Sequence, residues 1–187
     1  MTIQNHGVNV NLFAELALIS EGWVQDVRIS VGKDGKITEV ESGVDPDQLD
    51  CKLQNRILLP AMANLHSHSF QRSMAGMTEK RDKNPDSFWS WRDKMYGFLE
   101  QLNPEHVEAI AALVFMEMLE SGYASVGEFH YLHHQHGGQP YENVAETSSR
   151  IFSAALQTGI GLTHLPVFYM QGGMNGEQLS KGQLRFR

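Results

Sequence analysis

The chain has 187 residues, of which 41% are hydrophobic and 20% are charged, an ordinary balance for a globular protein. Its net charge of −7 argues against nucleic acid or an acidic membrane surface as a partner, and no apolar run approaches the roughly 20 residues of a membrane span. The polar N-terminus lacks the layout of a signal peptide and Cys51 is the only cysteine, so we expect a cytoplasmic protein without an intrachain disulfide.

The N-terminal part of the chain has the pattern of short strands. Apolar and polar residues alternate over 27–31, which is typical of a half-buried strand. The sequence Gly-Lys-Asp-Gly at 32–35 predicts a turn, and the apolar residues at 37–40 predict the returning strand. The pattern therefore predicts a hairpin, followed by a polar loop over 43–56.

Strands and helices alternate from residue 57 onward. Asn103-Pro104 is a helix start, with a capping side chain followed by proline in the first turn, and Gly122 ends that helix. Strands are predicted at 57–66, 124–131 and 161–169, and helices at about 87–102 after a cap at Asp86 or Ser87, at 104–121 and at 142–158. Such alternation predicts parallel βα units.

The first of these strands ends in His66-Ser67-His68. If the segment is extended, side chains two residues apart point the same way, so both imidazoles face one point. Imidazole is the commonest protein ligand of catalytic divalent metals. A pair of hydrogen-bonded histidines at a strand end is the alternative, but the position at the polar end of an apolar strand favours a metal site.

Longer motifs surround this pair. Leu59-Pro60 through His68 resembles the first barrel strand of the amidohydrolase superfamily, although Ala61 stands where that superfamily usually has glycine. The match narrows over three ordered blocks, which are Ser67–Gly76, Asp86–Arg92 and Glu128–His134. Together these blocks closely resemble the formimidoylglutamate deiminase family, and the resemblance runs from about Phe13 to the last residue.

The resemblance implies an α/β fold, namely the N-terminal part of a (β/α)8 TIM-type barrel of a metal-dependent hydrolase with a small N-terminal β-domain. We expect residues 1–56 to form part of a small β-sandwich-like domain and residues 57–187 to form the first βα units of an incomplete amidohydrolase barrel. Because a complete barrel takes roughly 250 residues, we expect the chain to be an N-terminal fragment of a longer enzyme.

The implied activity is hydrolysis of N-formimino-L-glutamate to N-formyl-L-glutamate and ammonia in histidine degradation, a reaction on the C–N bond of a linear amidine. By resemblance, His66 and His68 are metal ligands and one Zn²⁺ is the expected metal, although two histidines also suit iron, nickel or copper. The remaining ligands and the catalytic Glu and His are expected beyond Arg187. We therefore expect no catalytic residue within the chain and no activity of the fragment alone.

The resemblance also implies three substrate-binding residues, Gln71, Arg92 and Tyr131. Arg92 lies in Trp89-Ser90-Trp91-Arg92, and a guanidinium can grip a substrate carboxylate with two parallel hydrogen bonds. Tyr131 falls at the end of the second strand, where barrel enzymes place functional residues. Arg72, which is nearer the histidine pair in sequence, competes with Arg92 for the carboxylate.

Two alternatives stay open at this point. One is another amidohydrolase, a guanine- or triazine-type deaminase or chlorohydrolase, although an arginine in a tryptophan frame favours an acidic ligand over a flat neutral ring. The other is a catalytically inactive fragment.

A cluster of further histidines could suggest a second metal site, but we expect His130 to pack in the barrel and His133, His134 and His136 to line a loop. The expected partner is the small-molecule substrate formiminoglutamate, and we expect neither a nucleic-acid nor a membrane partner. We expect the full-length protein to be a homodimer.

Overall fold

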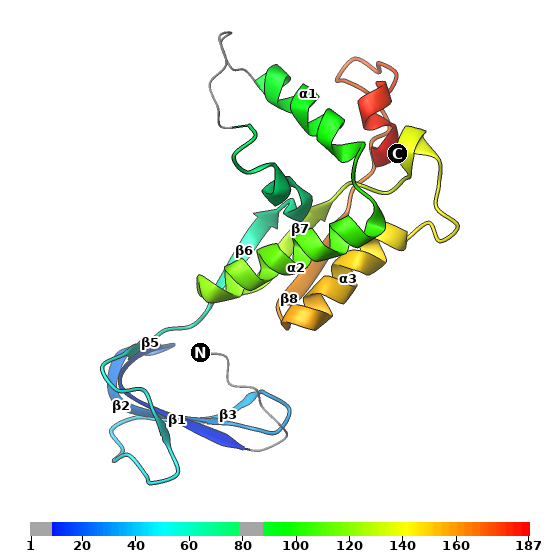
Figure 1. The fold of residues 1–187 in the computed structure, drawn as a ribbon. Coiled ribbons are helices and arrows are strands. Elements are labelled where there is room, and N and C mark those ends of the chain that lie inside the picture. Colours follow the sequence, from blue (N-terminus) through cyan, green and yellow to red (C-terminus); the bar gives the residue numbers. More distant parts are fainter. Residues whose placement is uncertain (1–8, 79–87) are drawn as a thin grey trace. The chain divides into compact units, whose positions relative to one another are not determined.

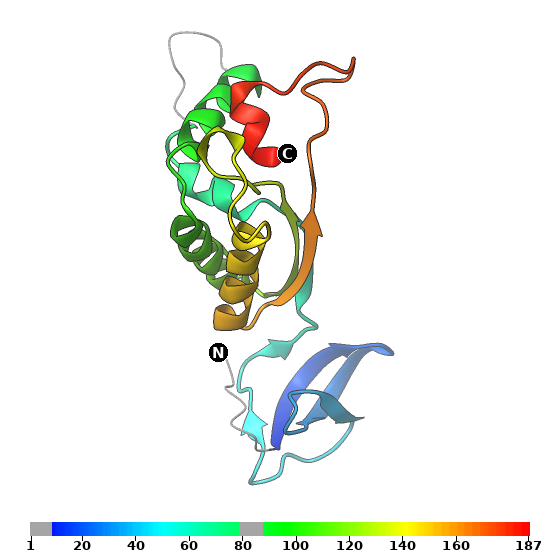
Figure 2. The same ribbon diagram turned by 90° about the vertical axis from the view of Figure 1, so that its right-hand side faces the viewer.

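The computed structural model describes residues 9–78 and 88–187, and Figures 1 and 2 show the ribbon from two directions. The chain divides into two compact units, Met1–Pro60 and Ala61–Arg187. Within the described ranges, none of the helices combines the length and apolar character that crossing a bilayer requires. The helix cap predicted at Asp86 or Ser87 lies outside these ranges.

The first unit is built on a five-stranded sheet in the order β3-β2-β1-β4, with β5 also pairing with β1. Its strands are β1 (Val10–Ile19), β2 (Gly22–Val31), β3 (Ile37–Glu41), β4 (Cys51–Lys52) and β5 (Ile57–Leu58). The antiparallel pairing of β2 with β3 confirms the predicted hairpin. The assignment of residues 1–56 and 57–187 to two domains stays a prediction.

The single strand predicted over residues 57–66 is divided in two. Ile57–Leu58 pairs with β1 in the first unit, whereas β6 (Met62–Ser67) pairs with a strand of the second unit. Pro60 lies in the gap between them and has no N–H to donate to a strand ladder. The apolar run is therefore continuous in sequence but contributes one strand to each of two different sheets.

The second unit consists of parallel βα units, as predicted. Its sheet has the order β6-β7-β8 with parallel pairing throughout. The further elements are η1 (Ser69–Met74), α1 (Phe88–Leu99), α2 (Pro104–Glu120), β7 (Tyr123–His130), η2 (His136–Gly138), α3 (Glu146–Thr158), β8 (Gly161–Pro166) and η3 (Lys181–Phe186). Figure 2 shows α2 and α3 on the same side of this sheet.

Local sequence explains the ends of the two long helices. The Asn103 side chain accepts a hydrogen bond from the backbone N–H of His106 at 2.8 Å, and Pro104 occupies the first turn of α2. Helix α3 ends at Gly159, whose φ of 81° is left-handed and favours glycine. The start of α2 and the end of α3 thus agree with the predicted ranges, while α3 begins four residues later than predicted.

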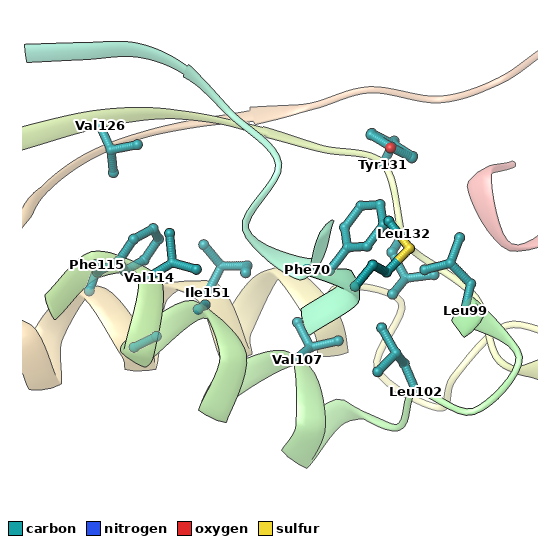
Figure 3. Packing of buried hydrophobic residues seen from close by; sticks show 14 of the residues in the cluster. Phe70, Leu99, Leu102, Val107, Val114, Phe115, Val126, Tyr131, Leu132 and Ile151 are labelled. Carbon is teal, nitrogen blue, oxygen red and sulfur yellow. The ribbon is translucent and has the colours of Figure 1, made fainter. Parts of the chain in front are cut away.

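The core of the second unit extends from the space between the sheet and helices α2 and α3 to buried residues of η1, α1 and η3. Figure 3 shows Val126 of β7 pointing toward Phe115 and Val114 of α2. Because side chains alternate along a strand, Glu128 and His130 share this helix-facing side with Val126, and all three are at most 2% exposed. The opposite side of the strand carries Phe129. The two faces of β7 thus have different environments, and the candidate site uses both.

Candidate metal and substrate site

The two histidines at the end of β6 converge. Their Nε2 atoms lie 3.0 Å apart, and the ring centroids are 4.6 Å apart in an edge-on arrangement. This separation is compatible with bonds of about 2.0–2.1 Å from both nitrogens to one zinc ion. The geometry agrees with the expectation that His66 and His68 face one point, and their role as ligands stays a prediction.

The protonation of His68 is fixed by its neighbour on β7. Its Nδ1 lies 2.9 Å from the Phe129 carbonyl oxygen, which can only accept, so Nδ1 carries the proton and Nε2 presents a lone pair toward His66. Burial lowers the pKa of His68, which also favours the neutral ring. The facing nitrogens can share either one proton or one cation, and the second arrangement is a metal site.

A β-bulge, which the sequence did not predict, aims His66. Asn64 pairs with Val126 and Ser67 with Glu128, so three steps along β6 oppose two along β7. The extra residue turns His66 away from the helices. The Asn64 side-chain oxygen accepts from the His66 backbone N–H at 3.2 Å. A Cβ on Gly127 would lie 3.0 Å from the backbone oxygen of Leu65, so glycine leaves room for the bulge.

Two of the predicted substrate-binding residues contact each other beside the histidine pair. The Gln71 amide donates to the Tyr131 hydroxyl at 2.8 Å, and that hydroxyl lies 3.7 Å from the sulfur of Met95 on α1. The Tyr131 ring centroid is 5.0 Å from that of His68. Burial raises the pKa of Tyr131, so its phenol stays protonated and able to donate.

Arg92 lies on α1, apart from these four residues. Its guanidinium carbon is 4.4 Å from the Trp89 ring centroid and 5.6 Å from that of Tyr96. The Nε atom is buried and, among the described residues, has no hydrogen-bond partner. No hydrogen bond or ring contact within that part of the chain joins Arg92 to the histidine pair, but its helix reaches the site through the Met95–Tyr131 contact.

Arg72, the competitor of Arg92, is engaged elsewhere. Its Nε and one terminal nitrogen donate to the two carboxylate oxygens of Glu117 on α2 at 2.8 Å and 2.7 Å. This bidentate pair occupies the donors that a substrate carboxylate would need. The geometry therefore favours Arg92 over Arg72.

Glu128 is a site residue to which the sequence reasoning assigned no role. It is 1% exposed, and its Oε1 accepts two hydrogen bonds from Ser69, directly after the histidine pair. Burial raises the pKa of this carboxyl, and the bonds from Ser69 oppose that shift. The available signal was an acidic residue at a position that strand alternation places on the buried side, together with Val126 and His130.

His130 and His164 have protein partners on the helix-facing side of the sheet. His130 Nε2 lies 3.1 Å from the Thr147 hydroxyl, His164 Nε2 lies 3.0 Å from the Ser148 hydroxyl, and both partners belong to α3. Burial lowers the pKa of His130 to about 3. Across residues 9–78 and 88–187, no group of three or more His, Cys, Asp or Glu side chains could hold a metal ion. A metal ion held by the convergent pair would therefore need further ligands from outside these residues.

Comparisons with known proteins bear on both units. The family described as "Amidohydrolase family" matches residues 57–169, and "Formimidoylglutamate deiminase HutF, N-terminal domain" matches residues 10–52. The formimidoylglutamate deiminase of Pseudomonas aeruginosa is 46% identical over 175 residues, which are 94% of this chain and 38% of that protein. The chain thus spans little more than a third of the length of this curated relative.

Solved structures give the same picture of the fold. A crystal structure of an amidohydrolase from Brucella melitensis has a TM-score of 0.88 and 45% identity, covering 95% of this chain and 39% of the other. A second match is a variant of atrazine chlorohydrolase TrzN from Arthrobacter aurescens, complexed with zinc and atraton, with a TM-score of 0.64. The match covers 90% of this chain and 37% of the other at 16% identity, so it shows the fold alone. The matches confirm the expected fold class, the N-terminal part of a TIM-type hydrolase barrel with a small N-terminal β-domain.

Proposed function

The chain belongs to the amidohydrolase family, and on this premise we propose that the whole protein hydrolyses N-formimino-L-glutamate to N-formyl-L-glutamate and ammonia in histidine degradation. The observation that carries the proposal is the 46% identity to the Pseudomonas aeruginosa formimidoylglutamate deiminase over 94% of this chain. The match of residues 10–52 to the N-terminal domain of that enzyme family supports the same substrate.

His66 and His68 are the proposed ligands of one divalent metal, and we propose Zn²⁺. The 3.0 Å separation of their Nε2 atoms and the proton held on His68 Nδ1 support this assignment. Zinc in structures of the same fold supports the choice of metal. When bound, such an ion supplies Lewis acidity and lowers the pKa of a coordinated water. The other ligands are proposed to come from outside the described residues.

Arg92 is proposed to bind a carboxylate of the substrate. Its buried Nε has no partner in the described part of the chain, and Trp89 covers one face of its guanidinium. A guanidinium that is shielded from water in this way gains more from a carboxylate than an exposed one does. This preference for an acidic ligand also makes a flat neutral ring, such as guanine or a triazine, the less favoured substrate.

Gln71 and Tyr131 are proposed to bind the polar end of the substrate next to the metal pair. In the absence of substrate they satisfy each other through the 2.8 Å hydrogen bond between amide and phenol. A substrate polar group can replace that bond without leaving either side chain unpaired in a buried position. The protonated phenol of Tyr131 provides a donor over the whole physiological pH range.

The remaining proposals concern the context of the enzyme. We propose that residues 1–56 contribute to the small β-domain and residues 57–187 to the barrel, and that the catalytic Glu and His lie beyond Arg187. We further propose a homodimer in the cytoplasm without a nucleic-acid or membrane partner. The net charge of −7 supports the absence of such partners, and the single cysteine supports the cytoplasmic location. The incomplete ligand set supports the proposal that this span alone is inactive.

The test compares the whole protein with the 187-residue chain, both supplied with zinc, by following ammonia release from N-formimino-L-glutamate. Release by the whole protein alone would support both the reaction and the incomplete site. Release from guanine or a triazine but not from formiminoglutamate would favour the alternative substrates. Release by the short chain would contradict the proposal that ligands and proton-transfer groups are missing from it.

A further inference from the structure

Glu128 joins β7 to the segment that carries the histidine pair. Its Oε1 accepts from the backbone N–H and from the hydroxyl of Ser69, both at 2.7 Å. Ser69 is 2% exposed, so without Glu128 both donors would be buried and unpaired, which is costly. The contact links residues that lie 59 positions apart in the sequence.

Two consecutive residues of β7, Glu128 and Phe129, accept hydrogen bonds from the two consecutive residues that follow β6, Ser69 and His68. The backbone carbonyl of Phe129 accepts from the His68 ring, and the side chain of Glu128 accepts from Ser69 on the helix-facing side of the sheet. Because the two contacts hold the side chain of residue 68 and the backbone N–H of residue 69, they oppose rotation of the backbone between these residues. Such a rotation would move the Nε2 atom of His68 away from that of His66.

The same contact controls the position of Gln71. Ser69 is the first residue of η1, and the backbone N–H of Gln71 donates to the His68 carbonyl at 3.0 Å. The Gln71 side chain then reaches Tyr131. A shift at Ser69 would therefore displace a proposed metal ligand on one side and a proposed substrate-binding residue on the other.

A purely structural role does not account for the choice of a carboxylate. No ion pair to Glu128 occurs in the part of the chain that the structure describes, and its Oε2 is buried without a hydrogen-bond partner there. A buried carboxyl with one unused oxygen is costly, and such groups call for a functional explanation. Burial raises the pKa of Glu128, in line with that cost.

We propose that Glu128 is a positioning residue that fixes the His66–Ser69 segment, so that the two imidazoles converge and Gln71 stands beside them. This inference rests on the proposed metal-dependent function. Glu128 touches neither imidazole, and it acts through Ser69. Its effect should therefore be visible in metal affinity and in KM, beyond any effect on folding.

The experiment uses the whole protein and measures the zinc dissociation constant by chelator competition, kcat and KM at saturating zinc, and the melting temperature. In Glu128→Ala the zinc dissociation constant should rise by about 10- to 100-fold, as for other residues that orient metal ligands, and KM should rise with it. In Glu128→Gln the amide oxygen can still accept both bonds from Ser69, so most of the zinc affinity should return.

Thr147→Val is the matched control. Thr147 is also 1% exposed, and its hydroxyl hydrogen-bonds the Leu132 carbonyl and His130 away from the convergent pair. This variant should lower the melting temperature and leave zinc affinity and KM unchanged. Ser69→Ala removes only one of the two donors and supplies the test if Glu128→Ala fails to fold; a smaller loss of zinc affinity is expected.

Wild-type zinc affinity and KM in Glu128→Ala, or in Ser69→Ala if the former does not fold, would overturn the inference, as would an equal loss of zinc affinity in Thr147→Val. If the wild-type protein binds zinc and the variants follow the expected order, but formiminoglutamate is not hydrolysed, the proposed substrate fails while the positioning role stands. A wild-type protein that binds no zinc would overturn both.

Discussion

The second unit contains two groups of histidines that differ in the partner of Nε2. In one group this atom faces another imidazole, and in the other it faces a hydroxyl group. In the pair at the end of β6, the Nε2 atoms of His66 and His68 face each other 3.0 Å apart. In the group beneath α3, His130 and His164 each have Nε2 next to a hydroxyl of that helix. The first arrangement is suited to holding a cation, and the second joins the helix to the sheet.

The two arginines beside the site differ in the same way. Arg72 makes a bidentate pair with Glu117, whereas the Nε of Arg92 lacks a hydrogen-bond partner among the described residues. Residue type therefore does not separate functional from structural groups in this molecule. What separates them is whether the histidine Nε2 or the arginine Nε already has a partner elsewhere in the fold, and substitutions in the two sets should have different consequences.

The largest effect is expected at the convergent pair. His66→Ala in the whole protein should abolish stoichiometric zinc binding and lower kcat/KM by on the order of 10³-fold, because a metal ion contributes several kcal/mol to transition-state stabilisation. Zinc content of the purified protein and ammonia release measure the two effects. His164→Gln is the control, with unchanged zinc content expected. Full zinc content in His66→Ala would contradict the ligand assignment.

The next largest effect separates the arginines. Arg92→Ala should raise KM for formiminoglutamate by roughly 10²-fold, because loss of one partner of a shielded charge pair costs several kcal/mol. Arg72→Ala, which removes a partly exposed pair with Glu117, should change KM little. Steady-state kinetics on both variants decides the matter. A larger KM change in Arg72→Ala than in Arg92→Ala would reverse the assignment.

The histidines beneath α3 should act on stability instead of chemistry. Because the pKa of His130 falls to about 3 in the fold and is about 6.5 in an unfolded chain, the unfolded state binds more protons between these values. Stability should therefore be lost as pH falls from about 6.5 toward 3, with a slope of up to about 1.4 kcal/mol per pH unit. Denaturant unfolding at several pH values measures this slope, which His130→Gln should flatten.

The smallest effect concerns the bulge. Asn64→Ala removes the hydrogen bond to the His66 backbone N–H and should cost about 1 kcal/mol of unfolding free energy. Because the bulge aims His66, a modest loss of zinc affinity should accompany it. Gly127→Ala, which crowds the Leu65 backbone, should act in the same direction. A loss of stability with wild-type zinc affinity in both variants would show that the bulge does not position the ligand.

The local features of this chain could be predicted from its sequence. The Asn103-Pro104 start of α2, the glycine that ends α3 and the alternation of strands and helices depend on interactions within a few residues, which sequence pattern records directly. The sequence also predicted that His66 and His68 converge, although the bulge orients His66 and His68 lies just after the end of β6. The family resemblance supplied the remaining site residues, whose roles stay proposals.

Tertiary structure alone decided the features that depend on distant residues. The bulge at Leu65–His66 packs against Gly127. Gln71 hydrogen-bonds Tyr131, which is 60 residues away in the sequence, and Arg72 pairs with Glu117, which is 45 residues away. The division of the 57–66 strand at Pro60 likewise depends on two separate sheets. Sequence determined which chemical groups this protein has and on which elements they lie. Only the packing of β6, β7 and the helices decided which of those groups are satisfied within the fold and which remain available, because hydrogen-bond partners are set by distance in space.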